Sequence, residues 1–269
     1  MLNLRGIKIK GLGYVQRFLK NEFVFIFQGK KFYYAPLIEG SYDYILIDKS
    51  NEPETQLFLS KILPVLNMSN FIDVGASVGE FVISACKQPG VRQIFAFEPR
   101  PECAYVLKKN AELNNENKIM VYQFALSDIK ENIDFHLNPG GTSSGLYSNS
   151  MSEKIINIQT TTLDSILPRT LNNAIILVDV EGAEPKVLRG GINFIRNNNP
   201  LIIFEFNNIS KQHFGLPEIE GLLGESYSIY RLRGDGDLDL DFHNSWNCVA
   251  IPANSVFSDI LESSIKNIV

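Results

Sequence analysis

The stretch Phe71-Ile-Asp-Val-Gly-Ala-Ser-Val-Gly79 decides the fold of this 269-residue chain. Its first four residues are mainly apolar and predict a short buried strand. Gly75 lets the chain turn tightly, and Gly79 lets the next helix, expected over 79–87, begin close to a ligand. In a doubly wound sheet, ligands bind beyond the carboxyl ends of the strands. We therefore expect this loop to face a ligand.

Strands and helices alternate after residue 70. Apolar runs predict strands at 71–74, 93–97, 118–124, 174–178 and 201–204. Helical spacing predicts helices at 53–66, 79–87, 101–113 and 184–196, with Pro64 ending or kinking the first and Gly190-Gly191 interrupting the last. Strands that are apolar throughout are buried on both faces, as in parallel sheets covered by helices. The sequence therefore predicts an α/β fold with a Rossmann-like, doubly wound sheet.

Two flanking regions lie outside this alternation. Aromatic or β-branched runs at 23–27, 31–34 and 44–47 predict strands. We therefore expect a small N-terminal β-rich appendage over 1–52 and the main domain over 53–269. The tail predicts a helix at 217–223 and strands at 227–232 and 246–251. The acidic run 234–241 between these strands lacks the spacing and the closing glutamate of a calcium-binding EF-hand, so a solvated turn is expected.

Composition and charge limit the classes of partner. The formal net charge is -5 and the pI about 5.4, which disfavours nucleic-acid binding because phosphate neutralisation needs basic residues. Cys86, Cys103 and Cys248 show no metal-binding spacing, so incidental buried thiols are expected. No apolar run reaches the ~20 residues that span a bilayer, and residues 1–10 lack an apolar leader. We expect a cytoplasmic protein, and the sequence leaves its oligomeric state open.

Acidic residues that follow the second and third strands predict a nucleoside ligand. Glu98 ends the second strand and precedes Pro99. A carboxylate there is placed to accept hydrogen bonds from both hydroxyls of a ribose. Ser127-Asp128 follows the third strand. Asp128 is expected to accept from an adenine amino group, or to serve only as a turn residue.

Two kinds of nucleoside ligand fit this arrangement. A dinucleotide site needs the spacing Gly-x-Gly-x-x-Gly. Here Ser77 lies between Gly75 and Gly79, and the central glycine is missing. The acid at Asp73 would repel a pyrophosphate but suits a ligand that carries an ammonium group. The charge therefore favours a methyl donor over a dinucleotide.

More carboxylates follow the last two strands of the alternation. Asp179, Glu181 and Glu184 fall within six residues, where the sheet is expected to open. A buried acid cluster is costly unless it is paired or functional. Glu184 also suits the first turn of a helix, where the helix dipole favours an acid. Glu205 stands at a comparable strand end.

At this point the sequence resembles the FkbM-type methyltransferases. The matching segments run in the family's order from about residue 53 to 206: Phe71-Ile-Asp-Val-Gly-Ala-Ser-Val-Gly79, Phe97-Glu-Pro-Arg-Pro101, Ala125-Leu-Ser-Asp128, Thr161-Thr-Leu-Asp-Ser165, Leu177-Val-Asp-Val-Glu-Gly-Ala-Glu184, Val187-Leu-Arg-Gly-Gly191 and Ile203-Phe-Glu205. The resemblance implies a Rossmann-like methyltransferase fold, S-adenosyl-L-methionine as cofactor, and methyl transfer to oxygen, often a hydroxyl of a sugar or polyketide-like product. Family members usually carry Asn where Ser77 stands.

The residues and the resemblance together predict the site. The expected cofactor-binding residues are Asp73, Gly75, Ser77, Gly79, Glu98, Pro99, Ser127, Asp128 and Asp179. Asp179 or Glu181 is expected to act as general base or to position the acceptor hydroxyl. We assign no metal, and a divalent cation held by Asp179, Glu181 and Glu205 is the alternative use of these carboxylates.

His213 is a further candidate base. The segment 138–145 is a candidate lid or an ordinary surface loop. The expected acceptor is a small molecule or a glycan. Two other function classes stay open: an NAD(P)-dependent oxidoreductase on a similar fold, and a non-catalytic ligand-binding module.

Overall fold

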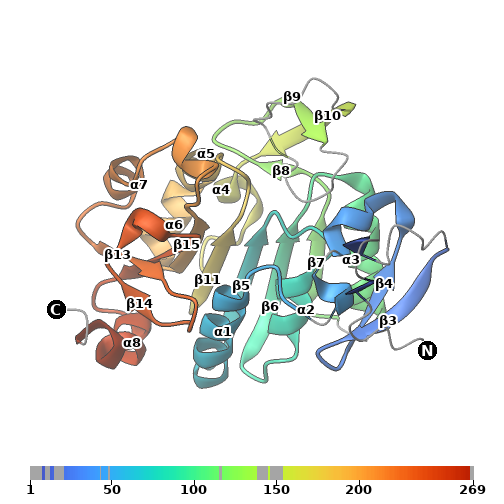
Figure 1. The fold of residues 1–269 in the computed structure, drawn as a ribbon. Helices are drawn as coiled ribbons and strands as arrows, with labels where there is room; N and C mark the ends of the chain where they lie inside the picture. The colour runs from blue at the N-terminus through green and yellow to red at the C-terminus, as the bar shows by residue number, and fades with distance from the viewer. Residues whose placement is uncertain are drawn as a thin grey trace.

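The structure is a computed structural model that describes residues 8–9, 13–14, 21–42, 44–47, 49–114, 117–137, 145 and 154–266. Within this part of the chain, the main sheet has the strand order β14-β13-β15-β12-β11-β5-β6-β7 (Figure 1). The strands are β5 (Ser69–Val74), β6 (Val91–Phe97), β7 (Ile119–Tyr122), β11 (Ala174–Val178), β12 (Leu201–Glu205), β13 (Tyr227–Leu232), β14 (Leu238–Asp239) and β15 (Asn247–Pro252). The five neighbouring strands β7, β6, β5, β11 and β12 pair in parallel, and β15 pairs antiparallel with both β12 and β13.

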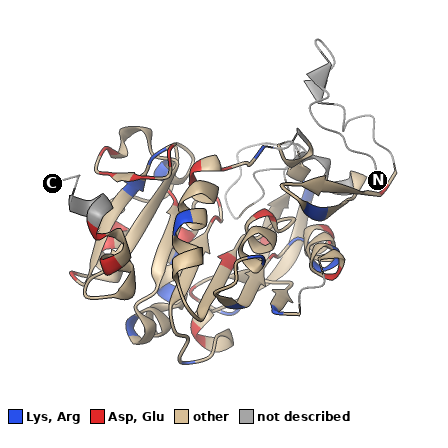
Figure 2. Cartoon of the chain, turned by 90° about the horizontal axis from the view of Figure 1, so that it is seen from below, with Lys and Arg blue, Asp and Glu red and all other residues tan. Residues whose placement is uncertain are grey.

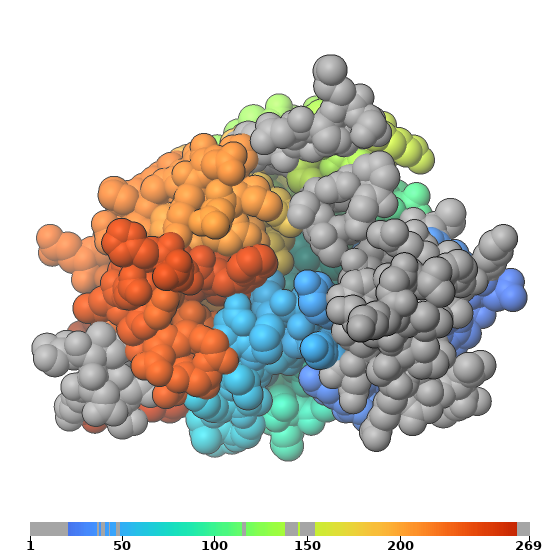
Figure 3. Space-filling view, viewed as in Figure 1, coloured from blue at the N-terminus to red at the C-terminus, as the bar shows by residue number. Residues whose placement is uncertain are grey.

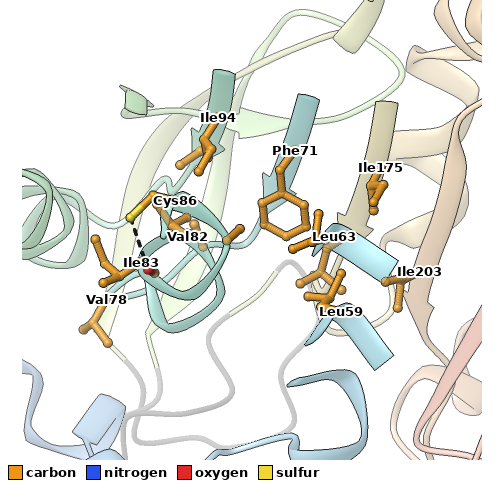
Figure 4. Packing of buried hydrophobic residues seen from close by; sticks show 14 of the residues in the cluster. Leu59, Leu63, Phe71, Val78, Val82, Ile83, Cys86, Ile94, Ile175 and Ile203 are labelled. Carbon is orange, nitrogen blue, oxygen red and sulfur yellow. Dashed lines mark hydrogen bonds between the residues drawn. The ribbon is translucent and has the colours of Figure 1, made fainter. Parts of the chain in front are cut away.

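Helices cover both faces of this sheet. The helices on one face are α1 (Pro53–Ile62), α2 (Glu80–Cys86), α3 (Pro101–Leu113) and α8 (Val256–Lys266), and those on the other are α4 (Leu163–Ile166), α5 (Glu184–Gly190), α6 (Ile192–Asn198) and α7 (Leu216–Leu223). Successive side chains of a strand point to opposite faces. Phe71 therefore packs with Leu59 and Leu63 under α1, while its neighbour Ile72 belongs to the other core cluster (Figure 4). The predicted doubly wound fold is confirmed.

The chain changes direction across the sheet between β5 and β11. From β5 it proceeds outward through β6 to β7, and it then returns to β11 and proceeds outward through β12. The carboxyl ends of β5 and β11 therefore flank the topological switch point, where α/β sheets bind ligands.

Two predicted helix boundaries are confirmed. The α1 helix ends at Ile62, and a 3-10 turn at Leu63–Val65 contains Pro64. The predicted break at Gly190-Gly191 divides α5 from α6. A Cβ on Gly190 would lie 1.9 Å from the carbonyl oxygen of Ser127, so close packing also requires glycine there.

In the N-terminal region the first two predicted strands, β3 (Phe23–Phe27) and β4 (Lys30–Tyr34), form an antiparallel hairpin, and β1 (Lys8–Ile9) pairs antiparallel with β2 (Gly13–Tyr14). The hairpin packs against α3, where the Tyr33 amide donates to Asn110 Oδ1 at 2.6 Å. The strand predicted at 44–47 is wrong: Ile45–Ile47 forms a 3-10 turn. Ile45 and Leu46 are both buried, so this apolar run does not alternate as a half-buried strand does.

The middle of the chain has more regular structure than the sequence predicted. A small sheet of order β8-β10-β9 stands beside the main sheet, formed by β8 (Ala125–Leu126), β9 (Asn132–Leu137) and β10 (Lys154–Thr161) (Figure 1). Its core consists of alternate residues such as Phe135, Leu137 and Ile158. The alternation of apolar and polar residues around Phe135 and Leu137 is the pattern in the sequence that predicts β9. The α8 helix was also missed, although Phe257 and Leu261 follow helical spacing.

Charges on the described chain are of mixed sign (Figure 2). In the acidic loop, Asp235 pairs with Arg233, Asp237 with Lys61 and Asp239 with Arg231. The predicted solvated turn is found only in the first half of the run, because Leu238–Asp239 forms strand β14 and Leu238 is buried. Cys86, Cys103 and Cys248 are buried, as expected. In the part of the chain that the structure describes, none of the helices has the length and apolar character needed to cross a bilayer.

Candidate active site

A cavity of about 350 Å³ opens at the carboxyl ends of β5, β6, β11 and β12. Seven carboxylates are among its described lining residues: Glu52, Asp73, Glu80, Glu98, Asp179, Glu181 and Glu205. Arg100 is the only basic residue among those described. Because the acids outnumber the base, the cavity favours a ligand that carries positive charge. Gly75, Ser77 and Pro99 also line it.

The glycine loop is held tightly against the neighbouring strands. The amides of Gly75 and Ala76 both donate to the carbonyl of Phe97 at 3.0 Å. Gly75 has a φ of +93°, and a Cβ on it would lie 1.9 Å from the carbonyl oxygen of Asp179. Gly79 has a φ of +87°, and a Cβ there would lie 2.2 Å from Leu107 Cδ1. Gly79 is not among the lining residues, so in this structure it serves the packing of α2 against α3.

Glu98 is fixed through both carboxylate oxygens. The Ser77 amide donates to Oε2 at 2.9 Å, and the Arg100 amide donates to Oε1 at 2.8 Å. Burial raises the pKa of Glu98 to about 7, against the effect of these two donors. Each carboxylate oxygen can accept a second hydrogen bond. Glu98 can therefore still accept hydrogen bonds from hydroxyl groups of a ligand in the cavity.

Asp73 lies at the base of the cavity and is 2% exposed. Its Oδ2 has no hydrogen-bond partner. Burial, and then the nearby Asp179, hold the pKa of Asp73 well above its ordinary range. A buried acceptor without a partner is costly, and a cationic donor group from a ligand would satisfy it.

The loop after β11 places Asp179 and Glu181 at the cavity. Glu181 and Gly182 both have positive φ, +56° and +101°. Glu184 stabilises this turn from behind: its Oε1 accepts from the amides of Val180 at 3.1 Å and Gly182 at 3.3 Å. Glu184 is fully buried and is not among the lining residues, and burial raises its pKa to about 8. Its position therefore indicates a structural role.

Asp179, Glu181 and Glu205 come together as the sequence predicted. Each offers a carboxylate oxygen within 4.8 Å of the others. Glu205 accepts from Asn207 Nδ2 at 2.5 Å and from Ser210 Oγ at 3.1 Å. Burial, followed by Asp179 and Glu181, holds the pKa of Glu205 well above its ordinary range. Such an oxygen cluster has the ligand chemistry that a hard divalent cation prefers.

Glu52 is a site residue that the sequence did not reveal. It is 6% exposed, and its Oε2 accepts from Asn247 Nδ2 and, at 3.0 Å, from Thr55 Oγ1. Burial, and next the carboxylate of Asp179, raise the pKa of Glu52 well above its ordinary range. Figure 3 shows the chain around residue 52, in light blue, against the orange-red C-terminal segment. Glu52 reaches the site through a pairing 195 residues apart, which has no local signature.

Three residues that the sequence proposed for the site, Ser127, Asp128 and His213, are not among the described residues that line the cavity. Asp128 pairs with Arg189 at 3.1 Å, and the cavity is lined by Ala125 and Leu126 instead of Ser127 or Asp128. The ring of His213 packs against Gly182, since a Cβ on Gly182 would lie 2.5 Å from it. His213 is not among the lining residues described.

The proposed lid falls mostly outside the described residues, which include only Gly145 of the segment 138–145. The Gly145 backbone pairs with His136. A Cβ on Gly145 would lie 3.2 Å from the Glu181 Cβ, so the chain passes beside the carboxylate cluster at this point.

The comparisons with known proteins agree on the family. The model of the methyltransferase FkbM domain matches residues 73–231. A hexuronic acid methyltransferase of Haloferax volcanii is 28% identical over 134 residues, 49% of this chain, and the chain spans about half (53%) of that relative's length. The crystal structure of a methyltransferase FkbM from Methylobacillus flagellatus shares the fold, with a TM-score of 0.50, 16% identity, and coverage of 80% of this chain and 53% of that one.

The match covers more than half of the chain and includes Glu98 and the loop from Asp179 to Glu184. It therefore confirms the predicted family, enzyme class and methyl donor, while the role of each site residue stays a prediction. This chain belongs to the FkbM family of S-adenosylmethionine-dependent methyltransferases.

Proposed function

We propose that this protein transfers a methyl group from S-adenosylmethionine to a hydroxyl oxygen of a sugar or glycan. The observation that supports this proposal best is the carboxylate-lined cavity at the switch point. In it, Glu98 is fixed where it can accept hydrogen bonds from a ribose, and Asp179 and Glu181 line space that an acceptor could occupy. The hexuronic acid methyltransferase among the relatives supports a sugar as the acceptor class.

The donor would bind along the ends of β5 and β6. Glu98 would accept the two ribose hydroxyls, since both of its oxygens are fixed at the cavity wall. Asp73 would accept from the ammonium group through its unpartnered Oδ2. Gly75 and Ser77 would lie against the amino-acid part of the donor. When bound, the donor supplies an activated sulfonium methyl group, so the chain's main task is to position the reactants.

The acceptor hydroxyl would bind beside Asp179 and Glu181. A sugar hydroxyl is a weak nucleophile, and a carboxylate that takes its proton as the new bond forms lowers the barrier. Burial raises the pKa of Asp179, which makes its carboxylate a stronger base than an exposed aspartate. Glu181 stands at the same cavity wall. If a divalent cation bound at Asp179, Glu181 and Glu205, the same residues would orient the hydroxyl through the metal.

The test is an assay with S-adenosylmethionine labelled in its methyl group, offered to sugars, uronic acids, disaccharides, a protein mixture and RNA. We expect label in the sugar fraction, and mass spectrometry should locate one added methyl group on oxygen. Glu218→Gln, which changes an exposed carboxylate paired with Arg189 outside the cavity, serves as control and should retain activity. Label in protein or RNA but in no sugar would overturn the proposal.

A further inference from the structure

A second cavity, of about 520 Å³, adjoins the active-site cavity. The two share Tyr44, Asn51 and Trp246 as lining residues. We refer to the second cavity as the outer cavity. Asn51 and Trp246 directly precede Glu52 and Asn247, which bond to each other beside Asp179. The outer cavity therefore opens from the carboxylate end of the active site.

The active-site cavity is too small to hold both reactants in full. Its volume of about 350 Å³ is near the lower end of the ~300–1,000 Å³ that a single small-molecule site occupies. A bound methyl donor would take up most of that space. The acceptor can then place its reacting hydroxyl beside Asp179 and Glu181, but the rest of it must extend outward past Tyr44 and Trp246.

The walls of the outer cavity have the chemistry that binds a sugar ring. Trp246, the only tryptophan of the chain, is 52% exposed, and Tyr44 is 43% exposed. Aromatic faces at a ligand cavity offer apolar area with a polar edge, which matches the C–H face of a pyranose. Asn51 and Glu54 supply polar groups for its hydroxyls.

The backbone that carries Trp246 is anchored in the fold. The Trp246 carbonyl accepts from the Phe206 amide at 2.8 Å, and the flanking Ser245 and Asn247 are buried. On the facing segment, Asn51 Nδ2 donates to Glu80 Oε2 at 3.0 Å. An anchored backbone reduces the entropy lost when a ligand binds, which favours recognition of a ring.

We propose that the outer cavity is a subsite for a second sugar ring of the acceptor, stacked on Trp246. The proposal rests on the proposed sugar methylation and adds to it: the acceptor is a glycan or glycoside of at least two rings rather than a free monosaccharide. Trp246 and Tyr44 are then the residues that select acceptor length.

Kinetics with matched acceptors test the subsite. With the sugar methylated in the assay above, we compare the monosaccharide with a disaccharide that carries the same reacting ring. Trp246→Ala should raise KM for the disaccharide about tenfold and leave KM for the monosaccharide and the affinity for S-adenosylhomocysteine within about twofold. Trp246→Phe should retain most of the preference. Tyr105→Ala, which removes an equally exposed ring on α3, should change nothing. Equal KM values for the two sugars in the native protein, or equal losses for both in Trp246→Ala, would overturn the subsite.

Intrinsic fluorescence provides a second readout that does not need turnover. Because the chain has a single tryptophan, its emission reports on Trp246 alone. With S-adenosylhomocysteine present, the protein is titrated separately with two disaccharides, cellobiose and the disaccharide of glucuronic acid and glucose, and with the single sugars glucose and glucuronic acid. A saturable change with a disaccharide and none with the single rings supports the subsite. No change with any disaccharide overturns it. Absence of turnover on every sugar overturns the proposed function instead, whatever the fluorescence shows.

Discussion

The backbone of Gly75 touches the carbonyl oxygen of Asp179, so that a Cβ on Gly75 would lie 1.9 Å from that oxygen. The Asp179 amide in turn donates to the Val74 carbonyl at 2.9 Å. The loop proposed to hold the donor and the residue proposed to receive the acceptor's proton are therefore in direct contact. A change at Gly75 must move one of them.

Gly75→Ala should destabilise the protein and abolish donor binding. The new methyl group clashes with a backbone atom, and φ of +93° is unfavourable for alanine, so we expect a loss of about 3 kcal/mol or more. Thermal unfolding and calorimetric titration with S-adenosylhomocysteine measure the two effects. Gly221→Ala is the control, because a Cβ there has open space within α7. Unchanged donor affinity in Gly75→Ala would contradict the contact.

Glu98→Gln should weaken binding of S-adenosylhomocysteine by about 10- to 100-fold. A hydrogen bond to a charged group contributes about 1.5–3 kcal/mol, and the amide side chain cannot accept through both of its ends as Glu98 does. Asp128→Asn is the informative comparison, because Asp128 pairs with Arg189. We expect less than about a threefold loss there. A loss as large as that of Glu98→Gln would support the adenine contact that the sequence suggested.

Ser77→Asn should stabilise the protein and retain donor affinity. Ser77 has a φ of +47°, a conformation in which asparagine is several-fold enriched over other non-glycine residues. Its contact with Glu98 uses the backbone amide, which the substitution keeps. We expect a gain of about 0.5 kcal/mol, read as a small rise in Tm. A fall in Tm together with weaker donor binding would show that the serine hydroxyl itself is needed.

Most of this site could be predicted because it lies at strand ends. Apolar runs located β5, β6, β11 and β12, and parallel strands bring their carboxyl ends to one edge. Asp73, Glu98 and the pair Asp179 and Glu181 therefore reach one cavity from three separate parts of the sequence. The spacing alone determined this, without knowledge of side-chain contacts.

The other parts of the site depend on contacts between distant segments. Glu52 enters the cavity because Asn247 holds it, and Trp246 and Tyr44 line the same two cavities from distant parts of the sequence. Such pairings leave no period or spacing to detect. Asp128 shows the opposite case: it follows a strand as predicted, but Arg189 on α5 provides a partner that turns its carboxylate away from the lining.

The ligand-free protein should lose stability as pH rises from about 5 to about 8. Burial raises the pKa of Glu184 from an ordinary 4.5 to about 8, and that of Glu98 to about 7. Between the unfolded and folded pKa values, the folded state holds protons that the unfolded state has released. The stabilisation that these two groups contribute is therefore greatest below about pH 4.5, and it declines until the pH passes the pKa of each group in the folded state.

Glu184→Gln tests this directly through Tm measured between pH 5.5 and 8.5. Glutamine can still accept from the Val180 and Gly182 amides but cannot ionise. We expect a visibly shallower decline of Tm with pH than in the native protein. Glu218→Gln, at an exposed ion pair, should keep the native slope. A slope unchanged by Glu184→Gln would assign the pH dependence to other groups.

Glu181→Gln should lower kcat about 100-fold or more, the usual size of a general-base contribution, with little change in affinity for S-adenosylhomocysteine. The residue lines the cavity beside Asp179 and adopts φ of +56°, a conformation that is kept at functional turns at a cost of about 1–3 kcal/mol.

Chelation separates the two roles that the Glu181 carboxylate could have, general base or metal ligand. If Glu181 or Asp179 takes the proton directly, EDTA leaves kcat unchanged and Glu205→Gln has a smaller effect than either. We expect this outcome, because both Glu205 oxygens already accept hydrogen bonds from Asn207 and Ser210. Loss of activity in EDTA that Mg²⁺ restores would instead show that Asp179, Glu181 and Glu205 bind a cation together.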